Sequence, residues 1–204
     1  MIVGVLLAAG SSRRFGQAGS KLTQDLNGTP IIRWAAQALR EPRVAEIIVV
    51  TPTDDAALRD ALTGTGVRFV QNPDADRGLG RSIACGVSAV SPDATAALIA
   101  LGDEPFVDRT VVRAVIDRFE AANAAIVAPR FVGIPGHPVL FGRPTFAELA
   151  GLDGDRGARA VIQRDPARVS FLDLTEPPPG DVDTPDDLAL ARARAQNRAP
   201  FTPH

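Results

Sequence analysis

The sequence has 204 residues, 45% of them hydrophobic, and a formal net charge of −2. This composition is typical of a soluble globular protein, and the near-neutral charge gives no broad basic face that would suggest nucleic acid as a partner. The arginines near the apolar start follow it rather than precede it, so no secretory signal is expected, and no stretch is long enough to span a membrane. The single cysteine, Cys85, excludes an internal disulfide and favours a cytoplasmic location.

Apolar runs rich in β-forming residues alternate along the chain with helical patterns. The expected strands are residues 2–7, 47–50, 67–70, 97–101, 125–128 and 169–172. The expected helices are residues 30–39, 54–62, 81–89, 109–123, 158–164 and 185–195. Because the apolar runs are continuous, they suit strands that are buried on both faces. The order predicts an α/β fold, with a Rossmann-like, doubly wound and mainly parallel sheet.

The segment 129–144 breaks this alternation into glycines, prolines and short apolar pieces. Its stretch 139–141 predicts a hairpin or a crossing strand laid over the sheet edge. We interpret the segment as a small β excursion on the substrate side, within a single domain that covers residues 1–195. Residues 196–204 hold two prolines and no core pattern, and they predict a frayed tail.

The first strand-to-helix connection carries small residues and two arginines. It reads Ala-Ala-Gly-Ser-Ser-Arg-Arg-Phe-Gly over residues 8–16, and Lys21 follows. Ligands of open α/β sheets bind beyond the carboxyl ends of the strands, and this connection is the usual place for a phosphate. Gly10 and Ser12 would let backbone N–H groups approach phosphate oxygens, while Arg14 and Lys21 would neutralise the charge. For this loop alone, a tight surface turn with solvated arginines is the alternative.

Two familiar phosphate motifs are not found. The chain has no G-x-x-x-x-G-K-[ST] sequence, and Gly78-Leu79-Gly80 lacks the third glycine of a dinucleotide fingerprint and lies far from the first strand. These observations disfavour a P-loop protein and an NAD enzyme.

A carboxylate directly follows the expected strand 97–101, where the chain reads Gly102-Asp103-Glu104-Pro105. This position lies on the ligand-binding edge of the sheet, and Mg²⁺ prefers carboxylate and phosphate oxygens. Asp103 is therefore the candidate metal ligand. A cap for the following turn is the alternative role.

A second acidic cluster, residues 181–188, precedes the last helix, and Thr184-Pro185 predicts where that helix begins. Asp186 and Asp187 fall in the first helical turn, where the helix dipole alone explains them. Asp181 and Asp183 come before the cap, so the helix requires neither. Two loop carboxylates that fold back towards Asp103 would suit a metal held between two parts of the chain.

Taken together, these segments resemble the nucleotidyltransferase superfamily that activates sugars and cofactors, in which L-A-A-G-x-S-x-R-x-G…K opens the chain and G-D-x-P follows a central strand. The chain is more closely similar to the branch of molybdenum cofactor (molybdopterin) cytidylyltransferases. The residues that carry this closer resemblance are Gly136-His137-Pro138, the segment 154–159 and the segment 181–188. The matches run from residue 6 to residue 188 in the expected order. The resemblance implies a nucleotide-diphospho-sugar transferase-like fold.

The resemblance also implies which residues bind the nucleotide. The contacts to base and ribose would come from Leu6, Ala8, Ala9 and Gly10. Arg14 and Lys21 would hold the triphosphate, and Ser82 would help to close the nucleotide site. With alanine at position 9, the loop resembles the sequence associated with cytidine nucleotides. A glycine at this position would resemble the sequence associated with guanosine nucleotides.

For the rest of the site, the resemblance implies that Asp103 and Asp183 ligate Mg²⁺. His137, Asp155 and Arg159 would face the phosphate of the pterin. The implied reaction transfers CMP from CTP to the phosphate of molybdopterin or molybdenum cofactor and releases pyrophosphate, and a recipient molybdoenzyme would take the product.

A phosphate nucleophile is already ionised at neutral pH, so this chemistry depends on positioning and charge neutralisation and requires no strong general base. We therefore expect His137 to be a binding residue, with a surface histidine at a strand edge as the alternative. Two other functions remain open. One is a guanylyl- or sugar- or alditol-phosphate nucleotidyltransferase, and the other is a non-catalytic carrier of the nucleotide or cofactor.

Overall fold

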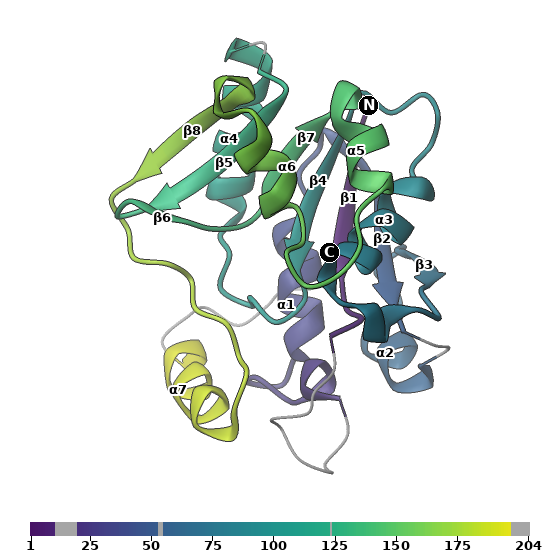
Figure 1. Cartoon of the computed structure of the whole chain (residues 1–204). Helices are drawn as coiled ribbons and strands as arrows, with labels where there is room; N and C mark the ends of the chain where they lie inside the picture. Colours follow the sequence, from purple (N-terminus) through teal and green to yellow (C-terminus); the bar gives the residue numbers. More distant parts are fainter. Residues whose placement is uncertain (11–19, 53–54, 123, 197–204) are drawn as a thin grey trace.

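The computed structural model describes residues 1–10, 20–52, 55–122 and 124–196. A mixed, eight-stranded sheet forms its middle layer (Figure 1). The strands are β1 (Ile2–Leu7), β2 (Val44–Thr51), β3 (Arg68–Gln71), β4 (Ala96–Leu101), β5 (Ile126–Phe131), β6 (Ile134–Pro135), β7 (Val139–Gly142) and β8 (Val169–Leu174). Their order is β3-β2-β1-β4-β7-β5-β6, and β8 pairs with β5. The mainly parallel α/β sheet expected from the sequence is confirmed.

Helices cover both faces of this sheet. The helices are α1 (Ile31–Ala38), α2 (Ala56–Ala61), α3 (Leu79–Ser88), α4 (Arg109–Ala122), α5 (Phe146–Ala150), α6 (Arg159–Arg164) and α7 (Pro185–Gln196). Short 3₁₀ helices are η2 (Lys21–Thr23), η3 (Ala75–Arg77), η4 (Arg143–Thr145) and η5 (Pro166–Arg168). Figure 1 shows α3, α5 and α6 on the near face of the sheet, with α1 and α4 behind it.

The core has two parts, one on each face of the sheet. Leu6 and Ala8 point into the cluster that includes residues of α1, α4 and α7. Leu7 and Ala9 point into the other cluster, with residues of α3, α5 and α6. Side chains of a strand alternate between its faces, so the two faces of β1 require two separate apolar partners. Continuous apolar strand sequences supply both faces, as the sequence predicted.

The strand β7 corrects one expectation. It lies inside the sheet between β4 and β5, antiparallel to both, rather than over the sheet edge. Its residues are buried, and Phe141 is fully covered. A strand with neighbours on both sides and helices on both faces contributes to the core from its whole surface, which is why its sequence is entirely apolar.

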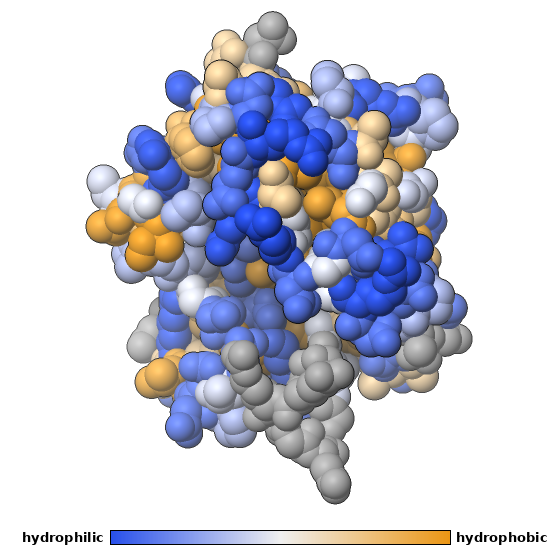
Figure 2. All heavy atoms as spheres, in the orientation of Figure 1, coloured by the Kyte–Doolittle hydropathy of each residue, from blue (hydrophilic) through white to orange (hydrophobic). Residues whose placement is uncertain are grey.

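The structure adds two elements that the sequence did not predict, the short helix α5 and the two-residue strand β6. Figure 2 shows an orange patch at the side of the molecule where Figure 1 places β6, and Val132 and Ile134 of this turn are 64% and 56% exposed. At the other end, α7 includes Gln196, the first residue of the expected tail, while residues 197–204 lie outside the described residues. Within the described residues, no helix is both long and apolar enough to cross a membrane.

Candidate nucleotide and metal site

The carboxyl ends of β1 and β4 meet side by side. Leu7 pairs with Leu101 in parallel register, and Gly102 donates its N–H to the carbonyl of Leu7 at 2.9 Å. The segment that begins with Ala8 therefore leaves the sheet beside the segment that contains Asp103. This adjacency brings two sequence motifs that are far apart in the chain to one place.

Gly102 lies in close contact with β1 and α1, so a side chain at this position would require its neighbours to shift. A Cβ at this position would lie 2.7 Å from Ile32 Cδ1 and 3.0 Å from the carbonyl oxygen of Leu7. The glycine lets the chain turn tightly off β4 against α1, and this turn places Asp103 at the edge of the sheet.

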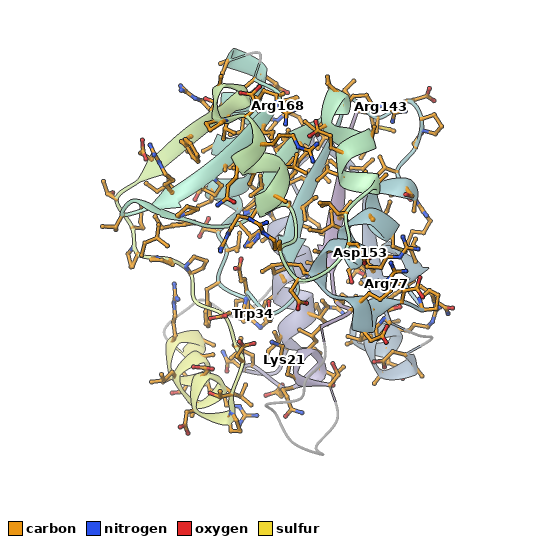
Figure 3. The ribbon with its side chains drawn as sticks, in the orientation of Figure 1. Lys21, Trp34, Arg77, Arg143, Asp153 and Arg168 are labelled. Carbon is orange, nitrogen blue, oxygen red and sulfur yellow. The ribbon has the colours of Figure 1, made fainter. Side chains whose placement is uncertain are left out.

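Lys21 lies between two carboxylates that come from opposite ends of the sequence. Its Nζ is 2.7 Å from Asp103 Oδ2 and 2.5 Å from Asp183 Oδ1. The lysine is the first residue of η2, which Ser20 caps by accepting a hydrogen bond from Leu22 N–H. Figure 3 labels Lys21 at the end of the sheet near α7. Lys21 is only 7% exposed, whereas the side chains of Asp103 and Asp183 are partly open to solvent.

The charge of Lys21 persists despite its burial. Burial by itself lowers the pKa of the Lys21 ammonium group, and the charges and hydrogen bonds of Asp103 and Asp183 outweigh that effect. The pKa of Lys21 therefore lies above its ordinary value. A fixed positive charge at this edge of the sheet is what a bound triphosphate requires.

Asp183 is held in place by the start of α7. The Asp187 carboxylate accepts hydrogen bonds from Asp183 N–H, Thr184 N–H and the Thr184 hydroxyl, at 3.1, 2.8 and 2.7 Å. Asp187 N–H returns a bond to Thr184 Oγ1, which completes a capping box. Asp187 therefore does more than interact with the helix dipole, which was the only role expected from the sequence, because its hydrogen bonds fix the backbone of Asp183.

A cavity of about 660 Å³ opens beside the ion-pair cluster. It lies between the ends of β1 and β4, η3 and the start of α3. Its lining residues are Leu7, Ala9, Gly10, Lys21, Leu22, Pro52, Ala75, Asp76, Gly78, Leu79, Ser82, Leu101, Asp103 and Asp155. This volume falls in the range of small-molecule sites. Because Lys21 and Asp103 belong to the lining, a ligand in the cavity would contact the charged cluster directly.

Two glycines beside the cavity, the lining residue Gly78 and its neighbour Gly80, pack closely against the 153–155 loop. Gly80 donates its N–H to the carbonyl of Gly154 at 2.8 Å, and a Cβ on Gly80 would lie 2.9 Å from the carbonyl oxygens of Asp153 and Gly154. A Cβ on Gly78 would lie 2.6 Å from the Gly154 carbonyl carbon, and Gly78 has a φ of +105°. The absence of side chains at both positions thus lets the 153–155 loop reach the cavity.

An ion pair between two exposed side chains, Arg77 and Asp153, also holds the 153–155 loop. Arg77 Nη2 lies 2.5 Å from Asp153 Oδ2, and Figure 3 shows the two residues side by side. In helix α3, Ser82 Oγ accepts a hydrogen bond from Nδ2 of the buried Asn72 at 3.1 Å. The Ser82 hydroxyl is thereby oriented at the start of α3, where it lines the cavity.

His137 lies against a buried carboxylate. Its Nδ1 is 3.1 Å from Glu104 Oε1, and Glu104 directly follows Asp103. This contact fixes the orientation of the imidazole ring and connects the segment before β7 to the segment after β4. The sequence analysis named His137 as a candidate but not its partner.

The structure brings together some of the predicted site residues. Those that line the cavity are Ala9, Gly10, Lys21, Ser82, Asp103 and Asp155. Asp183 joins them through Lys21. Asp155, expected on the acceptor side, shares the cavity with the residues expected to bind the nucleotide.

Other predicted residues lie elsewhere. The side chains of Leu6 and Ala8 point into the core. Within the described part of the chain, the cavity lining does not include His137 or Arg159, and Arg159 is exposed at the start of α6. Ser12 and Arg14 fall outside the described residues.

Several lining residues were not predicted, among them Leu22, Pro52, Asp76 and Leu79. Pro52 follows β2, which pairs with β1, so its position depends on the strand order. Gly78 and Gly80 were considered only as part of a dinucleotide motif. Two glycines so close in the sequence nevertheless indicate a place where another backbone can pack closely.

The two carboxylates, Asp103 and Asp183, suit a divalent cation whose remaining ligands come from a bound phosphate. Among the described residues no group of three or more His, Cys, Asp or Glu side chains converges on one point. Two carboxylates do converge, and the Lys21 ammonium already bridges them. Mg²⁺ commonly binds one or two carboxylates and completes its octahedron with substrate phosphates and water.

Comparison with known proteins identifies the family. The sequence pattern of the MobA-like NTP transferase domain matches residues 4–169, so the chain belongs to this family of nucleotidyltransferase-like proteins. The resemblance found in the sequence is thereby confirmed at the level of the family.

Two curated proteins are similar over nearly their whole length. The purine catabolism protein PucB of Bacillus subtilis is 29% identical, and the alignment covers 94% of this chain and 96% of that protein. Nicotine blue oxidoreductase of Paenarthrobacter nicotinovorans is 28% identical, with 92% and 94% covered. The crystal structure of Rv0371c from Mycobacterium tuberculosis has a TM-score of 0.79 and 30% identity, and covers 94% of this chain and 97% of that one. A structure of Rv0371c in complex with manganese has a TM-score of 0.75.

Proposed function

We propose that the chain transfers CMP from CTP to the phosphate of a molybdopterin-type acceptor and releases pyrophosphate. The observation that carries this proposal is the Lys21 ammonium between Asp103 and Asp183, at the wall of a cavity large enough for a nucleotide. Membership of the MobA-like NTP transferase domain family supports a nucleoside triphosphate as the donor substrate. The cytidine base and the pterin acceptor come from the sequence resemblance.

In this reaction an ionised oxygen of the acceptor phosphate attacks the α-phosphorus of CTP. The new P–O bond forms in line with the bond to the β-phosphate oxygen, which breaks and leaves with pyrophosphate. Lys21 would hold the triphosphate, together with Arg14 as the resemblance implies. The fixed charge of Lys21 would stabilise the negative charge that develops on the phosphate oxygens. Ser82, held by Asn72, would help to close the site around the nucleotide.

Asp103 and Asp183 would hold Mg²⁺, which supplies charge neutralisation at the phosphates when it is bound. Two observations support a divalent cation here. The two carboxylates converge within hydrogen-bond distance of one point, and a relative, Rv0371c, has a structure in complex with manganese. His137, oriented by Glu104, is proposed to contact the acceptor, as are Asp155 and Arg159.

The direct test is incubation of the purified protein with CTP, GTP or ATP, with Mg²⁺ and with molybdopterin or its molybdenum form, while pyrophosphate is measured. We expect pyrophosphate release to require Mg²⁺, CTP and the pterin together. Affinities measured by calorimetry should favour CTP over GTP, since Ala9 corresponds to the cytidine version of the loop. GTP bound at least as well as CTP would overturn the choice of base, and release with a sugar phosphate instead of the pterin would overturn the choice of acceptor.

One relative favours a second candidate. Nicotine blue oxidoreductase is named for a redox activity, and its alignment covers 92% of this chain. A redox function would require no pyrophosphate release and no carboxylate pair. Oxidation of NADH or NADPH by the protein with a quinonoid dye, in the absence of any triphosphate, would establish this candidate, and its absence alongside pyrophosphate release would eliminate it.

A further inference from the structure

The Lys21 ammonium group lies where a metal ion that bridges Asp103 Oδ2 and Asp183 Oδ1 would bind. A cation that contacts both Asp103 Oδ2 and Asp183 Oδ1 must lie between them, and Lys21 Nζ lies there, at 2.7 and 2.5 Å from these oxygens. Metal–oxygen distances of about 2.0–2.2 Å for Mg²⁺ or Mn²⁺ require nearly the same point. The lysine and the metal therefore compete for one position.

The charges around this point suit one cation at a time. Of the described side chains, the two carboxylates that contact the Lys21 ammonium are already paired with its positive charge, and this pairing weakens their attraction for a divalent ion beside it. The described residues supply no third carboxylate, histidine or cysteine to strengthen the site. A bound triphosphate would have two effects. Its oxygens would supply additional ligands for the metal, and its negative charge would offer the Lys21 ammonium another partner within the same cavity.

We propose that Lys21 keeps the metal position closed until a triphosphate draws its ammonium group away, so that the divalent cation and the nucleotide enter as a pair. This inference rests on the proposed function insofar as Asp103 and Asp183 are the metal ligands. It assigns Lys21 a second role as a positioning residue that sets the order of binding. The protein alone should then bind free metal weakly, although its two carboxylates converge.

The first test measures Mn²⁺ binding without nucleotide, by the loss of the electron paramagnetic resonance signal of free Mn²⁺. Lys21→Met removes the competing charge and keeps an unbranched side chain that is one atom shorter. We expect this variant to bind Mn²⁺ about tenfold more tightly than the wild type, or better, because two carboxylates without a counter-ion attract the metal strongly. Lys21→Arg keeps the charge and should bind Mn²⁺ as weakly as the wild type.

A double variant locates the ion. Adding Asp103→Asn to Lys21→Met should remove the gain in Mn²⁺ affinity, since one of the two ligands is lost. Equal Mn²⁺ affinity of the wild type and Lys21→Met would overturn the proposal. Retention of the gain in the double variant would overturn it as well, because the ion would then bind elsewhere.

The wild-type protein offers a test that does not depend on a folded variant. Lys21 is the only lysine of the chain, so protein labelled with ¹³C-lysine gives a single Cε signal by nuclear magnetic resonance. This signal should stay in place with Mg²⁺ alone and shift when Mg²⁺ and CTP are added together. A full shift with Mg²⁺ alone would contradict paired entry.

Both measurements are independent of the acceptor and of turnover. If the pyrophosphate assay with molybdopterin fails while Lys21→Met gains Mn²⁺ affinity and the Cε signal responds only to Mg²⁺ with CTP, the proposed acceptor is wrong and paired entry is supported. If pyrophosphate is released as expected but the Mn²⁺ affinity does not change in Lys21→Met, paired entry is wrong and the proposed function stands.

Discussion

Val182 donates its backbone N–H to the carbonyl of Asp103 at 2.9 Å, and this single bond joins the loop after β4 to the segment before α7. Val182 is buried in the same core cluster as Leu188 and Ala191 of α7. The carboxylates of Asp103 and Asp183 are thus brought together by packing and by backbone hydrogen bonding. Their convergence does not depend on the lysine alone.

Replacing Asp103 should abolish most of the catalytic activity without changing the folded structure. We expect Asp103→Ala to lower the rate of Mg²⁺-dependent pyrophosphate release by about 100-fold or more, since it removes a group that neutralises transition-state charge. The backbone bond to Val182 remains, so circular dichroism and the cooperativity of unfolding should be unchanged. Asp186→Ala is the matched control, because Asp186 is an exposed carboxylate of the same acidic cluster that has no proposed part in the metal site. Turnover of Asp103→Ala near that of the wild type would contradict the metal assignment.

The capping box at the start of α7 predicts a change in stability that depends on pH. The hydroxyl and the backbone N–H of Thr184 hold the pKa of Asp187 below its ordinary value. The ionised carboxylate therefore stabilises the fold above the pKa of the unfolded state, about 4, and this contribution is lost as the pH falls through the lower folded value. Asp187→Ala should lower the melting temperature at pH 7, and its difference from the wild type should shrink in acid.

Asp186→Ala is the control for that experiment. It removes a carboxylate from the same first turn, so it reports the helix-dipole contribution without the capping box. Asp187→Ala should also reduce pyrophosphate release, because the backbone of Asp183 loses its anchor. Equal melting temperatures for the two variants at pH 7 would argue against the capping box.

A methyl group at position 78 should weaken nucleotide binding. Gly78→Ala would collide with Gly154 and with Asp155 Oδ1, so the 153–155 loop must move away from the cavity. Gly64→Ala has the same kind of positive φ, +76°, and no atom near the added Cβ. Gly64→Ala should lower the free energy of unfolding by about 1–2 kcal/mol through backbone strain and leave the affinity for CTP unchanged. Calorimetric titration of both variants with CTP and Mg²⁺ separates the two effects, and equal affinities would refute the predicted collision.

One substitution should stabilise the protein. Val132 and Gly133 form the two-residue turn between β5 and β6, with φ values of +49° and +82°. Turns of this type favour Asn-Gly, whereas a β-branched residue is strained there. Val132→Asn should raise the free energy of unfolding by about 1 kcal/mol, since Val132 is exposed and contributes little to the core. Chemical denaturation measures the change. Val132→Ala, which does not favour positive φ, should give a smaller gain.

The sequence predicted most of the fold because the central strands β1 and β4 are continuous apolar runs and the other main strands are rich in apolar residues, although β3 and β8 are only partly buried. The elements it missed depend on contacts between distant residues. Helix α5 has only five residues, too few for a helical repeat to be visible. The position of β7 was predicted wrongly, although the fully apolar stretch 139–141 is typical of a strand covered on both faces.

The candidate site was predicted in its parts and not in its arrangement. Lys21, Asp103 and Asp183 were each named from the sequence, yet nothing local indicates that the lysine lies between the two carboxylates. The partnership of His137 with Glu104 and the packing of Gly78 against Gly154 likewise arise only from tertiary structure. The functions proposed for these residues stay predictions until the assays above are made.

The position of β7 also bears on how the chain folds during synthesis. The parallel set β3-β2-β1-β4 is complete once residue 101 has been made, but β4 then has an open edge, and β5 cannot join it directly. The sheet closes only after residues 139–142 have emerged and inserted between the two halves. Until then β4 is an unpaired edge of the kind that promotes aggregation. A ribosome that pauses between these points would leave this edge of β4 without its partner strand.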